Sequence, residues 1–118
     1  LKEWYRVLKP GGQLRIAVPN FKVLVELYLN SKCPLNQILG PLYGEMDMGG
    51  SIIYHKTTYD LHSLKNLLQE IGFLNIEKYN WEDYPIHVLN DDHSQAYIPH
   101  MDKQHGTLIS LNIRCTKL

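Results

Sequence analysis

The sequence is poor in the features that would assign it quickly to a class of protein. Its 118 residues include only two cysteines, Cys33 and Cys115, which have no metal-ligand spacing and make no disulfide framework. Twelve basic side chains balance twelve acidic ones, and no Lys/Arg stripe is available to neutralise phosphates. No apolar run is long enough to cross a bilayer, and the first residues do not form a secretory signal. We therefore expect a cytoplasmic protein without a nucleic-acid or membrane partner.

The sequence contains six histidines, and all of them lie in its second half. Zinc sites need three or four ligands at short, fixed spacings, and no two of these histidines show the H-E-x-x-H pattern. The sequence therefore predicts no metal site. Asp91, Asp92 and His93 have two interpretations, a cation-binding or hydroxyl-steering group and a solvated loop. The six are His55, His62, His87, His93, His100 and His105.

The first 21 residues predict a helix, a turn and a strand in direct succession. Pro10 stops the helix, and Gly11 and Gly12 allow the positive φ of a tight turn. Apolar and polar residues then alternate through residues 14–18 as in a strand, which Pro19 ends. The helix should carry one apolar stripe, made of Leu1, Trp4, Tyr5 and Leu8.

The middle of the chain is less regular. A short helix should follow Asn20 or Phe21, and Pro34 is placed in the first turn of a second helix that runs to about Leu39. Gly40 and Pro41 should then break regularity, because neither residue favours a helix interior. We expect residues 30–51 to form an irregular, partly mobile excursion.

The second half contains three clear elements. Asp60 should cap a helix over residues 61–71, and Gly72 should end it. A strand follows over residues 74–79, and strict alternation over residues 109–116 predicts a closing strand. No linker, repeat or low-complexity tract divides the chain, so we expect one domain over residues 1–118.

These motifs resemble class I S-adenosylmethionine-dependent methyltransferases. In that family R-V-L-K-P-G-G-x-L, here residues 6–14, closes a helix and opens the fifth strand of the sheet. The motif L-x-x-L-L-x-x-x-G-F, here residues 64–73, belongs to the last helix and precedes the sixth strand, and residues 109–116 match the seventh. The resemblance implies an α/β fold that is part of the Rossmann-like methyltransferase fold. It also implies a three-stranded mixed sheet in the order 5-7-6, with the last strand antiparallel and helices flanking the sheet.

The cofactor-binding features of the complete family fold are absent from this sequence. In that fold a glycine-rich turn follows the first strand, and an acidic residue after the second strand holds the ribose. Gly11-Gly12 instead belongs to a helix-to-strand turn, and Gly49-Gly50 has no strand before it. The chain thus resembles the C-terminal portion of a methyltransferase that lacks the cofactor half. We expect S-adenosylmethionine to be the cofactor of the complete fold and not to be bound by this chain alone.

The resemblance and the strand positions indicate two candidate residues for catalysis or substrate binding. His55 lies where the family often carries a histidine near the acceptor pocket, so it is a candidate catalytic base and substrate-binding residue; a merely exposed histidine is the alternative. Asn20 follows the strand of residues 14–18 at its carboxyl end, where ligands sit in open α/β sheets. Its alternative role is to cap the next helix. Four aromatic residues have packing or pocket lining as alternatives: Trp4, Tyr5, Trp81 and Tyr84.

Two functions remain open from the sequence. The first is methyl transfer, with a sugar or small-molecule acceptor, because V-L-K-P-G-G-x-L-R-I-A-V-P-N and I-S-L-N resemble a branch linked to surface-polysaccharide synthesis. The second is a non-catalytic module that self-associates. A strand at residues 14–18 that lacks its fourth-strand neighbour would leave an open edge, and Trp4 would be exposed. We therefore expect a homodimer or a higher oligomer in the absence of an N-terminal half.

Overall fold

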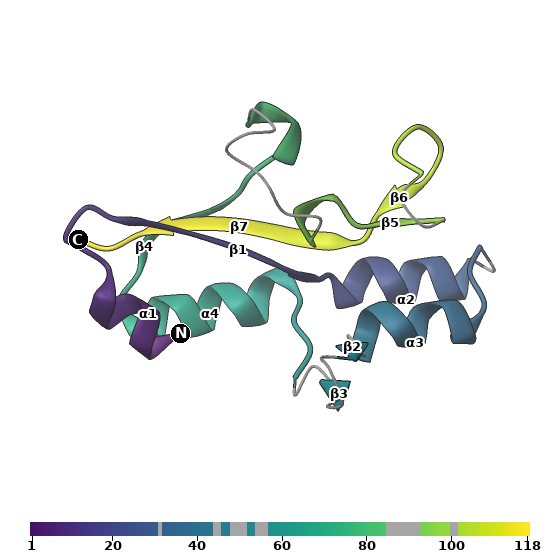
Figure 1. The fold of residues 1–118 in the computed structure, drawn as a ribbon, viewed down its shortest axis with the longest axis horizontal. Coiled ribbons are helices and arrows are strands. Elements are labelled where there is room, and N and C mark those ends of the chain that lie inside the picture. Colours follow the sequence, from purple (N-terminus) through teal and green to yellow (C-terminus); the bar gives the residue numbers. More distant parts are fainter. Residues whose placement is uncertain (31, 44–45, 48–51, 54–56, 85–92, 100–101) are drawn as a thin grey trace.

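The computed structural model describes residues 1–30, 32–43, 46–47, 52–53, 57–84, 93–99 and 102–118. Helices and strands are interspersed along this part of the chain (Figure 1). Among the described helices, none is both long enough and apolar enough to span a membrane. The elements are α1 (Lys2–Val7), β1 (Gln13–Pro19), α2 (Phe21–Leu29), α3 (Leu35–Tyr43), β2 (Met46–Asp47), β3 (Ile52–Ile53), α4 (Leu61–Ile71), β4 (Leu74–Lys78), the 3-10 turns η1 (Trp81–Asp83) and η2 (His93–Gln95), β5 (Tyr97–Ile98), β6 (Thr107–Leu108) and β7 (Ser110–Thr116).

The main sheet has three strands in the order β1-β7-β4, so the last strand of the chain is central. β7 pairs antiparallel with β1 from Gln13 opposite Thr116 to Pro19 opposite Ser110, and antiparallel with β4 on its other side. The predicted strand order and the reversed central strand are confirmed. The prediction of a mixed sheet was wrong, because β1 and β4 run in the same direction but β7 separates them. Both ladders are therefore antiparallel.

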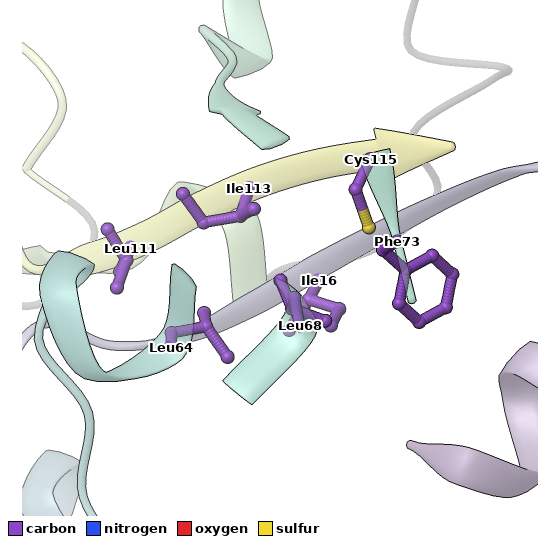
Figure 2. Close-up of a cluster of buried hydrophobic side chains, with 7 residues drawn as sticks. All are labelled: Ile16, Leu64, Leu68, Phe73, Leu111, Ile113 and Cys115. Carbon is purple, nitrogen blue, oxygen red and sulfur yellow. The ribbon is translucent and has the colours of Figure 1, made fainter. Parts of the chain in front are cut away.

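The principal core lies between this sheet and helices α1 and α4, which cover one of its faces (Figure 1). Alternation along the strands supplies the sheet side of this core, since Ile16 lies opposite Ile113 in the ladder. Leu64 and Leu68 contribute from α4, and Phe73 follows that helix directly. Figure 2 shows the complete cluster: Ile16, Leu64, Leu68, Phe73, Leu111, Ile113 and Cys115.

Helix α4 begins and ends where the sequence predicts. The Asp60 carboxylate accepts from the Ser63 amide at 2.8 Å, and the Ser63 hydroxyl accepts from the Asp60 amide at 3.1 Å, which completes a capping box. Gly72 follows the helix with φ +120°, where a Cβ atom would also lie 3.1 Å from the Tyr5 hydroxyl. A side chain at this position would be strained, so glycine fixes the turn into β4.

Helix α1 packs against the sheet through part of its apolar stripe. Leu1, Tyr5 and Leu8 pack against the principal core, and the Tyr5 ring meets Phe73 edge-on with centroids 5.0 Å apart. Trp4 belongs to the same stripe and is 51% exposed, as predicted. The helix spans only six residues, so one stripe of contacts is enough to hold it against the sheet.

Helices α2 and α3 form a second apolar cluster beyond the end of β1 (Figure 1). The expectation of an irregular chain after Leu39 was wrong for residues 40–43, because α3 continues through Gly40 and Pro41 to Tyr43. Residues 44–45 and 48–51 of the expected excursion lie outside the described residues. Ile38 is buried against α2 and Leu42 packs on the same cluster, so tertiary contacts outweigh the poor helix propensity of the two breakers. The buried members are Leu24, Leu27, Cys33, Ile38 and Ile109.

Candidate functional site

Asn20 lies at the carboxyl end of β1, between the strand and helix α2. Its amide donates to the Ile109 carbonyl at 2.7 Å, and its carbonyl accepts from the Leu24 amide at 3.1 Å. The backbone is therefore fixed on both sides. The side chain makes no capping hydrogen bond to α2, so the alternative of a helix-capping role is wrong.

The Asn20 side chain carries the strongest sign of a site in this region. Its Oδ1 atom is buried and has no hydrogen-bond partner among the described residues. Leaving a buried acceptor unsatisfied costs about 1–3 kcal/mol, which native proteins usually avoid. A ligand hydroxyl or N–H group that reached this atom would recover that cost.

The chain just before α4 runs alongside Asn20. Tyr59 forms an isolated parallel bridge with Asn20, and the Tyr59 carbonyl accepts from the Phe21 amide at 3.0 Å. Tyr59 directly precedes Asp60, so the capped start of α4 is anchored beside the end of β1. His55, the predicted catalytic and substrate-binding residue, stands four positions before Tyr59 in the sequence and lies outside the described residues.

The described histidines are not gathered into one site. His62 Nε2 lies 3.1 Å from Asn66 Nδ2 on the exposed side of α4, and His105 Nδ1 lies 3.8 Å from Asp102 Oδ1. Within the described parts of the chain, no three His, Cys, Asp or Glu side chains converge in a metal-holding group. His93 begins η2. The other residues considered for metal or proton chemistry lie outside the described residues, namely His87, Asp91, Asp92 and His100.

Both cysteines are buried and free. Burial raises the pKa of the Cys115 thiol to about 11, so this thiol stays protonated at neutral pH. Because the thiolate is the nucleophilic form, Cys115 acts as a small core residue. The Cys33 Sγ atom lies 3.6 Å from Gln37 Oε1 within the second apolar cluster.

A polar cluster on the other face of the sheet was missed by sequence reasoning. Arg15 and Arg114 lie directly opposite each other in the β1–β7 ladder, an arrangement that like charges disfavour. Tyr84 offsets the repulsion, since its hydroxyl accepts from Arg114 Nη1 at 3.0 Å and its ring centroid lies 4.8 Å from Arg15 Cζ. Glu77 accepts from Arg114 Nε at 2.8 Å. The Tyr84 hydroxyl and then Glu77 raise the pKa of Arg114.

This cluster continues along the ladder to Asn112 and Ser94. Asn112 Nδ2 and the Ser110 hydroxyl both donate to the Ser94 carbonyl, at 2.8 Å and 3.0 Å, which ties η2 to β7. The Asn112 Oδ1 and Arg15 Nη1 atoms are buried without hydrogen-bond partners among the described residues. Pairing residues 13–19 with 110–116 in register would have revealed this polar face, because Arg15, Arg114 and Asn112 occupy its alternate positions.

The aromatic residues of the 81–84 segment pack against other side chains. Trp81 Nε1 donates to the Tyr97 hydroxyl at 3.2 Å, and Lys103 Nζ lies 4.7 Å from a Trp81 ring centroid. Tyr84 meets Tyr79 edge-on with centroids 5.3 Å apart. Packing is thus the role that the structure gives to Trp81 and Tyr84.

A depression of about 350 Å³ lies at the junction of α4 and β4. Lys65 and Gln69 line one wall, and the chain from Gly72 to Ile76 lines the rest. It sits at the carboxyl end of α4, whereas Asn20 lies beside the amino end of that helix. The depression therefore belongs to a different part of the molecule from the Asn20 site.

Comparisons with protein-family models, with curated proteins and with solved structures found no match to this chain. The features that bear on function are therefore the sequence motifs, the sheet order and the side chains around Asn20.

Proposed function

We propose that this chain is the acceptor-side, C-terminal portion of a Rossmann-like class I S-adenosylmethionine-dependent methyltransferase fold. The observation that carries the proposal is the order β1-β7-β4 with a reversed central strand. This is the 5-7-6 order that the sequence motifs imply. The two motif-bearing elements, β1 after P-G-G and β4 after the G-F pair, occupy the two outer positions of the sheet.

Asn20 supplies the contact to the methyl acceptor in this proposal. It sits at the carboxyl end of β1, where ligands bind in open α/β sheets, and its buried Oδ1 has no partner within the described residues. That oxygen accepts a hydrogen bond from a hydroxyl next to the attacking hydroxyl of the acceptor, or from one N–H of an attacking amine, and so orients the attacking lone pair. Holding the reacting groups in the right geometry can supply a large part of a rate enhancement. A sugar is the acceptor class that fits the motif resemblance.

His55 completes the proposed site as a general base. The chain after it is anchored beside Asn20 through the Tyr59 bridge. A histidine has an unperturbed pKa near neutrality and can take the proton that the attacking hydroxyl or amine loses. S-adenosylmethionine supplies the electrophilic methyl group when it is bound, and the residues that would hold it are not found in this sequence.

The coding sequence immediately upstream of Leu1 tests the proposal. We expect an in-frame segment that encodes a strand, a glycine-rich turn and a helix, followed by a second strand that ends in an acidic residue. In a protein extended by that segment, His55→Ala should lower turnover about 10²–10⁴-fold, the usual contribution of a general base, with little loss of stability. His62→Ala is the matched control, because His62 is exposed on α4. An upstream segment without this pattern would contradict the proposal.

The second candidate is a non-catalytic module that self-associates. The specific observation in its favour is the position of β1 at an edge of the sheet. Among the described residues, only β7 pairs with residues 13–18. An unpaired strand edge is a ready template for another chain.

A further inference from the structure

The backbone hydrogen bonds of β1 show which of its groups point away from the sheet. The Gly12 carbonyl accepts from the Lys117 amide at 2.9 Å, and the Asn20 amide donates to the Ile109 carbonyl at 2.7 Å. Even-numbered residues of β1 therefore direct their backbone groups toward β7, because the direction alternates along a strand. Arg15 and Ala17 direct theirs outward. At the end of the strand the outward amide of Phe21 is already bound to Tyr59.

We propose that a second copy of this chain fills this edge, with the two β1 strands paired antiparallel about a two-fold axis at Ile16. Two three-stranded sheets then join into one six-stranded sheet, β4-β7-β1 continued by the partner's β1-β7-β4. This proposal deepens the second candidate function, the self-associating module, and rests on it, because an upstream methyltransferase half would place its own strand on this edge. It concerns the 118-residue chain by itself.

The hydrogen-bonding groups select this register. With the axis at Ile16, Arg15 lies opposite the partner's Ala17, and these residues exchange two backbone hydrogen bonds on each side of the axis. Gln13 lies opposite the partner's Pro19, which lacks an N–H but accepts through its carbonyl. Each outward amide from Gln13 to Ala17 thereby meets an acceptor, and the unpaired carbonyl of Gln13 lies at the end of the ladder, where water can donate to it.

Neighbouring registers are less favourable. An axis at Arg15 places the two arginine side chains directly opposite each other, and like charges in that position are destabilising. An axis at Ala17 places Gln13 opposite the partner's Phe21, whose amide is bound to Tyr59 within its own chain. The register at Ile16 avoids both conflicts.

The side chains on the core face also match in this register. Leu14 lies opposite the partner's Val18, and Ile16 lies opposite the partner's Ile16. Leu14 and Val18 are half-buried in the single chain and pack at the border of the principal core. Apolar cross-strand pairs of this kind stabilise a sheet, so the pairing extends each core across the two-fold axis.

Sedimentation equilibrium of the intact chain over a range of concentrations tests the proposal. We expect the mass to rise to twice the 13.7 kDa of the single chain. Over the same range, exchange of the Arg15 and Ala17 amide hydrogens should slow as dimers form. A single-chain mass at every concentration would overturn the proposal and would leave the methyltransferase assignment to its own test.

A matched pair of proline variants locates the interface. Ala17→Pro removes an outward amide from β1 and should lower the dimerisation constant at least tenfold. Lys78→Pro makes the same change on β4, where the Tyr79 amide donates to the Asn112 carbonyl at 3.1 Å and Lys78 therefore points outward. That variant should dimerise normally. The opposite pattern would place the interface on β4 and overturn the proposal. Circular dichroism confirms that each variant is folded before it is scored.

Charge changes at Ala17 test the register itself. Because Ala17 faces the partner's Arg15 twice in the dimer, Ala17→Glu should tighten dimerisation and Ala17→Arg should weaken it, each about tenfold from two symmetric cross-strand charge pairs. An equal effect of both variants would contradict the Ile16 register.

Discussion

Asn20 and Asp60 both precede a helix, yet their side chains do different things. The Asp60 carboxylate accepts from the Ser63 amide, whereas the Asn20 side chain makes no capping bond and leaves Oδ1 buried without a described partner. At the scale of single residues, this contrast separates a structural cap from a candidate ligand contact.

Asn20→Ala should change the free energy of unfolding by less than about 1 kcal/mol. Removal of an unsatisfied buried acceptor is close to neutral, whereas loss of an asparagine cap typically costs about 1 kcal/mol or more. Urea unfolding of the 118-residue chain measures the difference. Asp60→Ala is the control and should be clearly destabilising. If Asn20→Ala lowered the free energy of unfolding as much as Asp60→Ala does, Asn20 would have a structural role.

Protonation of the Asp60 carboxylate should lower the stability of the protein in acid. The Ser63 amide, and then the Ser63 hydroxyl, lower the pKa of the Asp60 carboxyl in the folded state. Its contribution to stability is therefore complete above the unfolded-state pKa of about 4 and is lost as the pH falls through the lower folded-state pKa. Urea unfolding at a series of pH values should show this loss. Asp60→Asn should flatten that part of the profile, and an unchanged profile would contradict the capping account.

At the scale of elements, α1 depends on a residue at the far end of the chain. Lys117 Nζ donates to the carbonyls of Tyr5 and Leu8 at 2.7 Å and 3.0 Å, and lies 4.7 Å from the Tyr5 ring centroid. A cation at the carboxyl end of a helix also complements its dipole. Six residues are too few for a stable helix alone, so this contact ties α1 to the end of β7.

Lys117→Met should lower the free energy of unfolding by about 1–3 kcal/mol, because it removes charge-assisted hydrogen bonds and keeps most of the aliphatic stem. Amide hydrogens of α1 should exchange faster than those of α4. Lys9→Met is the matched control, since Lys9 is exposed at the same end of α1. Equal effects of the two substitutions would show that Lys117 does not anchor the helix.

The sequence predicted the elements whose signals are local. Helix α4 carries a capping residue, a 3.6-residue apolar period and a terminal glycine, and its observed bounds match the prediction. Strands β1 and β7 were predicted from alternation alone. The continuation of α3 through Pro41 was not predicted, because contacts with α2 stabilise it against its local preference.

Long-range polar contacts explain the rest of what sequence reasoning missed. Arg15 and Arg114 lie opposite each other only when β1 and β7 are paired in register. The bridge between Asn20 and Tyr59 likewise joins residues that are distant in the chain. Of the two predicted site residues, Asn20 is placed at the end of β1 as expected, and the role of His55 stays a prediction.

At the scale of the whole molecule, the two faces of the sheet have different characters. Helices α1 and α4 cover the apolar face, and β5 and β6 lie on the opposite side (Figure 1). β1 is an outer strand with Asn20 at its carboxyl end. The proposed function uses that end, and the proposed dimer uses the outward edge of the same strand.

We propose that S-adenosylmethionine binds only when this acceptor-side chain is joined to an upstream cofactor half. Calorimetric titration of S-adenosylmethionine into the 118-residue chain, and into the chain extended by its upstream coding sequence, tests it most directly. We expect no measurable binding to the 118-residue chain and a micromolar Kd, about −8 kcal/mol, for the extended protein. Micromolar binding to the 118-residue chain, or none to the extended protein, would contradict it.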